Sequence, residues 1–171
     1  KIENLIQAAI NSEKFKNSNY TILIAGKATD AQLEYLESLK KMVRDHLLNE
    51  KIIFLGHIDG DEKEHLFAKS KFLVLPSESE NFGNVVIEAL NQRTPVIASL
   101  GTPWEILNKN NAGFHISNHP DTLKKYLEIS IEMSDSEYEN LSLNAEKLVD
   151  QEFNLESQIH NWIQVYRNLN F

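Results

Sequence analysis

The chain has 171 residues, of which 42% are hydrophobic and 25% are charged, the composition of an ordinary globular protein. It contains 17 basic and 25 acidic residues, and the formal charge of −8 argues against nucleic acid as the main partner. The absence of cysteine excludes disulfides and thiolate chemistry, and no apolar run is long enough to span a membrane.

The first element that the sequence predicts is a helix. Ile2, Leu5, Ile6 and Ala9 recur at helical spacing, and no strand pattern stands before them. Because the pattern opens inside a helix and the first residue is Lys1, we expect the chain to be part of a larger protein. Its length predicts a single domain over residues 1–171.

Two strand patterns with a long helix between them come next. Residues 20–25 predict a strand that ends at Gly26, and residues 51–55 predict a second strand that ends at Gly56. Between them, Asp30 can cap an amphipathic helix. The helix is expected to reach about Leu48, with four side chains facing inward: Leu36, Leu39, Val43 and Leu47.

Acidic and histidine residues in two loops imitate metal motifs. Residues 59–61 read Asp-Gly-Asp, but no third ligand is evident nearby. We interpret them as a helix start, with Asp61 as the cap and Glu64 as its partner in a capping box. His115 and His119 are four residues apart, but the local pattern is not helical, so no zinc site is expected.

The most informative stretch covers residues 71–99 and reads KFLVLPSESENFGNVVIEALNQRTPVIAS. A buried strand is predicted over residues 72–75 and another over residues 95–98. Between them, Gly83 lies where an acidic, serine-rich loop turns into a helix that begins at about Asn84. The unpaired amides of such a helix start are a ready site for phosphate.

Two carboxylates flank this helix start. Glu80 lies in the loop, and Glu88 follows eight positions later (88 − 80). On a helical wheel Glu88 shares the face of Asn84, whereas Val85 and Ala89 lie on the face expected to pack in the core. The pattern alone is also compatible with a first-turn acid favoured by the helix dipole and a second acid on a solvated face.

The remaining elements are a short helix, a last strand and a helical tail. Trp104 is expected to pack on the sheet after the turn at residues 99–103, and residues 113–116 predict the last strand. Ser134 and Glu137 form a capping box in the tail. Asn154 fits a further N-cap, and a stripe typical of core packing follows it: Leu155, Ile159, Trp162, Ile163 and Tyr166.

The order of these elements predicts an α/β fold with a Rossmann-like, doubly wound parallel sheet, helices on both faces and a helical C-terminal tail. Ligands in such sheets bind outside the carboxyl ends of the strands. The loops at Gly26, Gly56, Gly83 and Gly101 are therefore expected to converge on one cleft. The dinucleotide fingerprint G-x-G-x-x-G is absent, which argues against NAD and FAD.

The stretch around the two acids resembles the signature of retaining GT-B-type glycosyltransferases, the large family four. The matching residues are Pro76, Ser77, Glu80, Phe82, Gly83, Glu88, Ala89, Thr94, Pro95 and Val96. The resemblance covers nearly the whole chain and implies the C-terminal, donor-binding half of such an enzyme. Two residues depart from the family pattern, Thr102 in the turn before Glu105 and Arg93 at a position where glycine is common.

The resemblance implies roles for particular residues. Glu80 would be the catalytic residue that holds the donor sugar, and Glu88 would bind the ribose hydroxyls. His57 and Ile58 would line the nucleotide base pocket, although His57 is equally compatible with a surface histidine. The other implied donor-binding residues are Phe82, Gly83, Asn84, Val85 and Gly101.

The same resemblance implies transfer of a sugar with retention, without metal or cofactor, from a UDP- or GDP-linked donor to a glycan or lipid-linked acceptor. The implied setting is surface polysaccharide biosynthesis in the cytoplasm, with contact to the inner face of the membrane through the acceptor domain. That N-terminal domain and the cations that clamp the diphosphate would precede Lys1, so the isolated chain is expected to be inactive. Two alternatives stay open, a non-enzymatic nucleotide-sugar sensor and a GT-B-like nucleotide-sugar epimerase.

Overall fold

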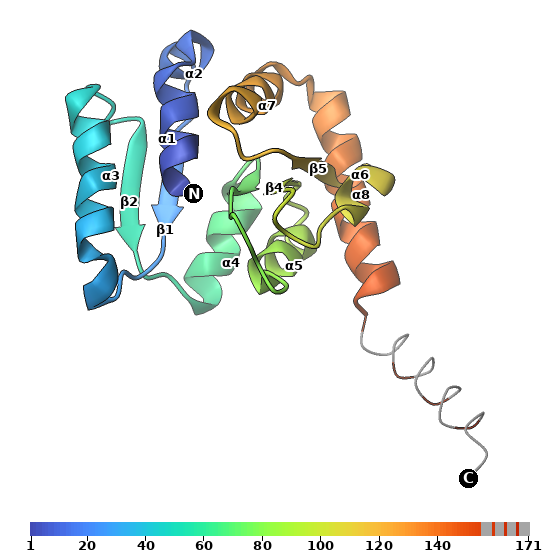
Figure 1. Cartoon of the computed structure of the whole chain (residues 1–171). Helices are drawn as coiled ribbons and strands as arrows, with labels where there is room; N and C mark the ends of the chain where they lie inside the picture. The colour runs from blue at the N-terminus through green and yellow to red at the C-terminus, as the bar shows by residue number, and fades with distance from the viewer. Residues whose placement is uncertain (155–158, 160–162, 164–166, 168–171) are drawn as a thin grey trace.

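A computed structural model describes residues 1–154, 159, 163 and 167, in which strands alternate with helices as far as residue 116 (Figure 1). The strands are β1 (Ile22–Ala25), β2 (Ile52–Gly56), β3 (Leu73–Leu75), β4 (Val96–Ser99) and β5 (Gly113–Ile116). The α-helices are α1 (Ile2–Ile10), α2 (Glu13–Asn17), α3 (Leu33–Asp45), α4 (Gly60–Lys69), α5 (Asn84–Asn91), α6 (Ile106–Lys109), α7 (Pro120–Glu132) and α8 (Asp135–Glu152). A short 3₁₀ helix, η1 (Asp30–Gln32), precedes α3.

All strand pairs are parallel, which confirms the predicted sheet type. β1 pairs with β2, and β4 lies between β3 and β5. The strands divide into these two hydrogen-bonded sheets instead of forming one. Doubly wound folds commonly have the strand order 3-2-1-4-5-6. The observed pairing matches that order on both sides, with no described strand in the central position between β1 and β3.

Helix α1 packs across both sheets. Its residues Leu5 and Ala8 belong to one apolar cluster that includes Ile97 of β4, with Ile22 of β1 and Val74 of β3 packed against it. In Figure 1, α3 lies beside β2 and α2 lies at the upper end of α1 next to α7, whereas α5, α6 and α8 lie with the other sheet. One helix therefore links the two halves of the sheet layer.

The two sheets are buried to different extents. All four residues of β4 are buried, as expected for a strand covered on both faces. In the other sheet, Leu23 and Ile53 are each 39% exposed and Leu55 is 38% exposed. Residues on the opposite face, such as Ile52, pack against α1 and α3. Helical cover on both faces is therefore complete for β4 but not for β1 and β2.

The end of α3 differs from the prediction. The helix stops at Asp45, and Leu47 takes a left-handed conformation with φ +56° and is 87% exposed. Leu48, which is only 4% exposed, takes the inward position, and its N–H donates to the Val43 carbonyl at 3.0 Å. Helical spacing placed Leu47 in the core because it cannot signal where a helix turns into a left-handed cap.

Replacing Leu47 with glycine is expected to stabilise the protein. A left-handed conformation costs a residue with a Cβ about 1–2 kcal/mol, while glycine adopts it freely and loses about 0.5–1 kcal/mol of chain entropy. The net gain is about 0.5–1 kcal/mol in the free energy of unfolding, measured by urea denaturation. The matched variant Leu48→Gly removes a buried side chain and is expected to destabilise instead. Equal stability of the two variants would contradict the left-handed cap.

Helix caps were predicted with mixed success. Thr29, and not Asp30, caps η1 in a capping box with Gln32. Helix α4 begins at Gly60 with Asp59 as its N-cap, so the predicted capping box at Asp61 is wrong. The helix starts one residue before Asp61, so Asp61 cannot be its N-cap. The Asp59 carboxylate lies beside the His57 imidazole and does not cap the helix.

The capping box of α8 is confirmed. The Ser134 hydroxyl donates to the Glu137 carboxylate at 2.6 Å, and the Ser134 N–H donates to it at 3.0 Å. These hydrogen bonds hold the pKa of Glu137 below its ordinary value. The helix proposed after Asn154 lies largely outside the described residues, as do Leu155, Trp162 and Tyr166. Its described members Ile159 and Ile163 are 53% and 41% exposed, unlike core residues.

Candidate functional site

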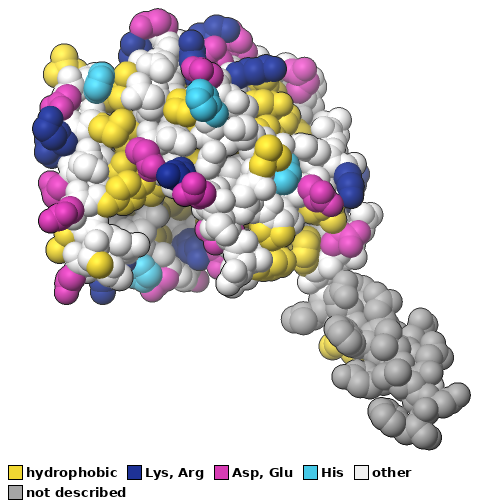
Figure 2. All heavy atoms as spheres, in the orientation of Figure 1, with side chains coloured by type: hydrophobic (Ala, Val, Ile, Leu, Met, Phe, Trp, Pro, Cys, Tyr) yellow, Lys and Arg dark blue, Asp and Glu magenta, His cyan; other side chains and the backbone are white. Residues whose placement is uncertain are grey.

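The loops that follow β3 and β4 form the centre of the predicted site. Because these strands are parallel neighbours, both loops leave the same edge of the sheet. The Glu80 N–H donates to the Gly101 carbonyl at 3.1 Å, which joins the two loops directly. The visible face of the molecule carries interspersed acidic and basic side chains, without a broad area of one sign (Figure 2).

Helix α5 begins as predicted. Gly83 is its N-cap with φ +81°, a left-handed conformation that favours glycine, and no side chain caps the helix. The Val86 N–H donates to the Gly83 carbonyl at 2.9 Å, while the N–H groups of Asn84 and Val85 belong to the unpaired first turn. The helix start therefore presents backbone donors of the kind that bind phosphate.

The predicted faces of α5 are confirmed. Val86, Ala89 and Leu90 are buried, whereas Asn84 and Glu88 are exposed. Val85 is half-buried and packs against the main core cluster. Any contribution of Val85 to a ligand would therefore come from its backbone.

Glu80 is held by its own loop. Its Oε1 accepts a hydrogen bond from the Ser77 hydroxyl at 2.9 Å, and the Ser99 hydroxyl in turn donates to the Ser77 carbonyl. Lys1 forms an ion pair with the neighbouring Glu78 at 3.3 Å. These contacts fix the loop on three sides and orient one oxygen of the Glu80 carboxylate.

Gly101 is required by close packing. A Cβ at this position would lie 2.0 Å from the Glu78 carbonyl oxygen and 3.0 Å from the Ser77 carbonyl oxygen. Both are backbone atoms, which cannot move aside as a flexible side chain can. Gly101 thus allows the loop that carries Glu80 to lie directly on the turn after β4.

Glu88 has a partner that sequence reasoning missed. The Lys63 ammonium of α4 lies 2.5 Å from its Oε2, and the side chains are 32% and 43% exposed respectively. The two residues are 25 positions apart (88 − 63), and only the packing of α4 on α5 brings them together. No local spacing signals such a pair.

Trp104 is the second residue with a contact in the site that sequence reasoning missed. The sequence predicts its packing on the sheet, and the side chain is 1% exposed. Its indole N–H donates to the Phe82 carbonyl, and its ring lies 5.3 Å from the Phe82 ring and 5.6 Å from the Phe153 ring. Trp104 therefore holds the backbone directly before the start of α5.

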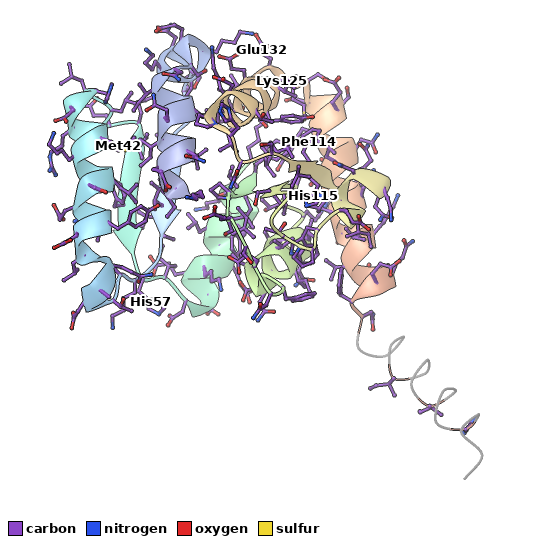
Figure 3. The ribbon with its side chains drawn as sticks, viewed as in Figure 1. Met42, His57, Phe114, His115, Lys125 and Glu132 are labelled. Carbon is purple, nitrogen blue, oxygen red and sulfur yellow. The ribbon has the colours of Figure 1, made fainter. Side chains whose placement is uncertain are left out.

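His57 and Ile58 lie in the loop after β2, with His57 near the lower end of that strand in Figure 3. The His57 side chain is 63% exposed, and its Nε2 lies 3.2 Å from an Asp59 carboxylate oxygen. Ile58 is half-buried. Their strand, β2, belongs to the other sheet from β3, the strand that the loop of Glu80 follows.

Two predicted departures have structural explanations. Arg93, at the position where the resembling family commonly has glycine, has φ +60°, the left-handed region. Its guanidinium pairs with Glu139 at 2.7 Å and Glu146 at 3.5 Å on α8, which anchors the unfavourable backbone. Thr102, the other departure, is 5% exposed, and its hydroxyl donates to the Ser99 carbonyl at 2.7 Å, which stabilises the turn after β4.

The histidines and acids singled out as metal candidates have other contacts. His115 Nε2 lies 3.0 Å from the Thr102 carbonyl, and His119 Nδ1 accepts the Asp121 N–H at 3.3 Å. Within residues 1–154, 159, 163 and 167 no group of three or more potential ligands could hold a metal ion. In that same part of the chain no helix meets the length and apolarity that crossing a membrane requires.

Two concave sites of the described residues contain none of the predicted donor-site residues. One, the β5–α7 pocket, is lined by Leu100, His115, Ser117, Thr122, Lys125 and Tyr126 together with Ile116 and Asp121. The other lies between α7 and α8 around Phe114 and Glu132. The donor roles of the residues around Gly83 stay a prediction.

Comparison with known proteins agrees with this geometry. The family model described as glycosyl transferases group 1 matches residues 1–148. The O-antigen chain mannosyltransferase RfbU of Salmonella typhimurium is 37% identical over 94 residues, which cover 55% of this chain and 26% of the relative. The uncharacterized glycosyltransferase MJ1607 of Methanocaldococcus jannaschii is 32% identical over 124 residues, which cover 71% and 30%.

Solved structures show the same fold. The C-terminal domain of the glycosyl transferase group 1 family protein LpcC of Francisella tularensis superposes with a TM-score of 0.80 at 25% identity, covering 90% of this chain and 80% of that one. Anabaena HepE, solved in complex with UDP and glucose, gives a TM-score of 0.82 at 20% identity, covering 98% of this chain and 44% of that one. The chain thus spans about a quarter to a third of the two curated relatives and less than half of HepE.

Proposed function

The chain belongs to the glycosyl transferases group 1 family, and on this premise we propose that it forms the donor-binding part of a retaining hexosyltransferase. The donor is a UDP- or GDP-linked sugar, and the acceptor is a glycan or lipid-linked sugar in surface polysaccharide assembly. The observation that carries the proposal is the uncapped start of α5 at Gly83, with Glu80 three residues before it and Glu88 in the second turn of the helix. A relative acts on O-antigen, and a structure of the same fold holds UDP-glucose.

The helix start supplies the charge stabilisation that the reaction needs. Departure of a nucleoside diphosphate leaves negative charge on its phosphates, and preorganised N–H groups lower that cost. The amides of Asn84 and Val85 provide such donors without a metal ion. We therefore propose that neither a metal nor another cofactor takes part.

The two carboxylates have separate roles in this proposal. Glu80, oriented by Ser77, holds the donor sugar, and its charge favours the positive character that develops on the sugar in the transition state. Glu88 accepts hydrogen bonds from the ribose hydroxyls. Lys63 occupies only Oε2 of Glu88, so Oε1 can accept from a ribose hydroxyl while the ion pair persists.

The chain represents one half of the complete enzyme in this proposal. The matches cover 26% and 30% of the two curated relatives, which supports a larger parent protein. The acceptor domain and the cations that clamp the diphosphate would come from that protein, so the chain alone binds donor weakly and transfers no sugar. A chain without cysteine fits the reducing cytoplasm, with the acceptor domain at the inner face of the membrane.

Nucleotide titration tests the donor site. UDP, GDP and ADP, bare and sugar-linked, are titrated into the wild type and Glu88→Ala by calorimetry. Loss of a hydrogen bond to a charged group costs about 1.5–3 kcal/mol, so the preferred nucleotide is expected to bind roughly 10- to 100-fold more weakly to the variant. For the 2′-deoxy form of that nucleotide, the Glu88→Ala substitution is expected to reduce the affinity much less.

Glu64→Ala is the matched control, because Glu64 is an exposed glutamate on the neighbouring helix α4. It is expected to bind like the wild type. Equal affinity of Glu88→Ala and wild type would rule out the ribose-binding role of Glu88. If the wild type binds none of the nucleotides tested, the donor-site proposal is overturned.

A further inference from the structure

The β5–α7 pocket adjoins the predicted donor site. The Leu100 N–H donates to the Ile116 carbonyl at 2.7 Å, which places the loop after β4 beside the end of β5. The next residue, Gly101, accepts the Glu80 N–H. Gly101 therefore lies between Leu100, which lines the pocket, and the loop that carries Glu80.

The pocket has an apolar wall. Leu100 is 64% exposed, although large aliphatic side chains are usually covered in a folded protein. The Tyr126 ring packs on the Phe114 ring with 4.9 Å between centroids, which fixes its position. Together with Ile116, these side chains offer a firm apolar surface at the edge of the sheet.

Hydrogen-bonding groups of both kinds line the other side. Lys125 on α7 has its ammonium 5.8 Å from the Tyr126 ring centroid and forms no ion pair with any residue that the structure describes. Asp121, one turn earlier, adds a carboxylate of opposite charge. Ser117 and Thr122 contribute hydroxyls that can donate or accept. Figure 3 shows Lys125 on α7 and His115 on β5, two of the three segments that line the pocket.

This combination selects the chemistry of the ligand. A phosphate or carboxylate would be repelled by the Asp121 carboxylate, and a purely apolar ligand would displace water from Lys125 and the hydroxyls without replacing its hydrogen bonds. A neutral polyol satisfies the donors and acceptors while its C–H groups cover Leu100 and Tyr126. The volume of about 520 Å³ lies in the range of small-molecule sites, about 300–1,000 Å³.

We propose that the β5–α7 pocket binds a neutral hexopyranose unit of the acceptor glycan. This inference rests on the proposed transferase function, because it assigns the adjoining substrate of the same site. The pocket would hold the acceptor on the side of Glu80 that lies toward β5, so that this chain contributes to acceptor choice as well as donor binding.

NMR titration of the full 171-residue chain tests the proposal. Methyl α-D-mannopyranoside and methyl α-D-glucopyranoside are the probes, with sodium glucuronate and inorganic phosphate as anionic comparisons. At least one hexoside is expected to shift the amide signals of Leu100, Ser117 and Thr122 saturably, with a dissociation constant on the order of 1 mM. Lys125→Met, which keeps the side-chain stem, is expected to weaken this binding about three- to tenfold.

Lys124→Met is the matched control, because Lys124 is the adjacent lysine of α7 and does not line the pocket. It is expected to bind the hexoside like the wild type. Absence of saturable hexoside shifts, equal affinity of Lys125→Met and wild type, or binding of the anions alone would each overturn the inference. Nucleotide binding without hexoside binding would overturn only this pocket, and hexoside binding without nucleotide binding would overturn only the donor site.

Discussion

Replacing Trp104 with alanine is expected to destabilise the protein more than any other single change considered. Removal of a fully buried tryptophan typically costs about 3–5 kcal/mol, a large share of the about 5–15 kcal/mol that stabilises a domain. The side chain is 1% exposed and contacts the rings of Phe82 and Phe153. Urea denaturation followed by circular dichroism measures the loss.

The variant is also expected to weaken nucleotide binding. The Trp104 indole donates to the Phe82 carbonyl, and Phe82 directly precedes Gly83 at the start of α5. Without that hydrogen bond the backbone before the helix is less well held, so its amides are less preorganised for phosphate. Affinity is measured at a temperature at which the variant is still folded.

Trp104→Phe separates the two contributions. Phenylalanine keeps an aromatic ring in the core but removes the donor to the Phe82 carbonyl. The loss of stability is expected to be smaller, about 1 kcal/mol for the hydrogen bond together with some loss of packing. If the free energy of unfolding of Trp104→Ala lies within about 1 kcal/mol of the wild-type value, the prediction is wrong, and the neighbouring side chains have moved into the space that the indole leaves.

Gly101→Ala is expected to damage the donor site through a backbone collision. The added methyl group would lie 2.0 Å from the Glu78 carbonyl oxygen, so the loop of residues 77–80 has to move away from the turn after β4. Forcing extra volume into a packed site costs about 1–3 kcal/mol. The movement also lengthens the hydrogen bond from the Glu80 N–H to the Gly101 carbonyl. Nucleotide-sugar affinity is therefore expected to fall at least about tenfold, which corresponds to about 1.4 kcal/mol.

Leu100→Ala is the control for this change. Leu100 precedes Gly101 in the same turn, but its side chain is 64% exposed and lies outside the predicted donor site. Its truncation is expected to change stability by less than about 0.5 kcal/mol and to leave nucleotide affinity unaltered. Wild-type stability and affinity in Gly101→Ala would mean that the two loops are not packed as described.

The elements around the site could be predicted because their signals are local. The apolar runs at residues 72–75 and 95–98 correspond to β3 and β4, and helical periodicity placed the start and the faces of α5 correctly. Gly83 was predicted to lie where the loop turns into the helix, and its φ of +81° is a conformation that a residue without a Cβ adopts at little cost. Predictions failed where one element ends against another, as at Leu47.

The contacts that orient the site could not be predicted, since they join distant parts of the chain. Lys63 reaches Glu88 only because α4 packs on α5, and Gly101 is required only because the loop of Glu78 passes over it. The periodicity of either segment contains no information about these neighbours. The β5–α7 pocket is similar, because three separate segments line it.

The sequence by itself determined the strand–loop–helix unit with its two acids, because apolar periodicity and glycine act within a few residues. The tertiary structure decided how that unit is used. It tied Glu80 to Ser77 and to the turn after β4, paired Glu88 with Lys63, and placed Trp104 beneath Phe82. The physical reason is that these orientations come from packing and hydrogen bonds between elements, which exist only after the chain has brought distant residues together.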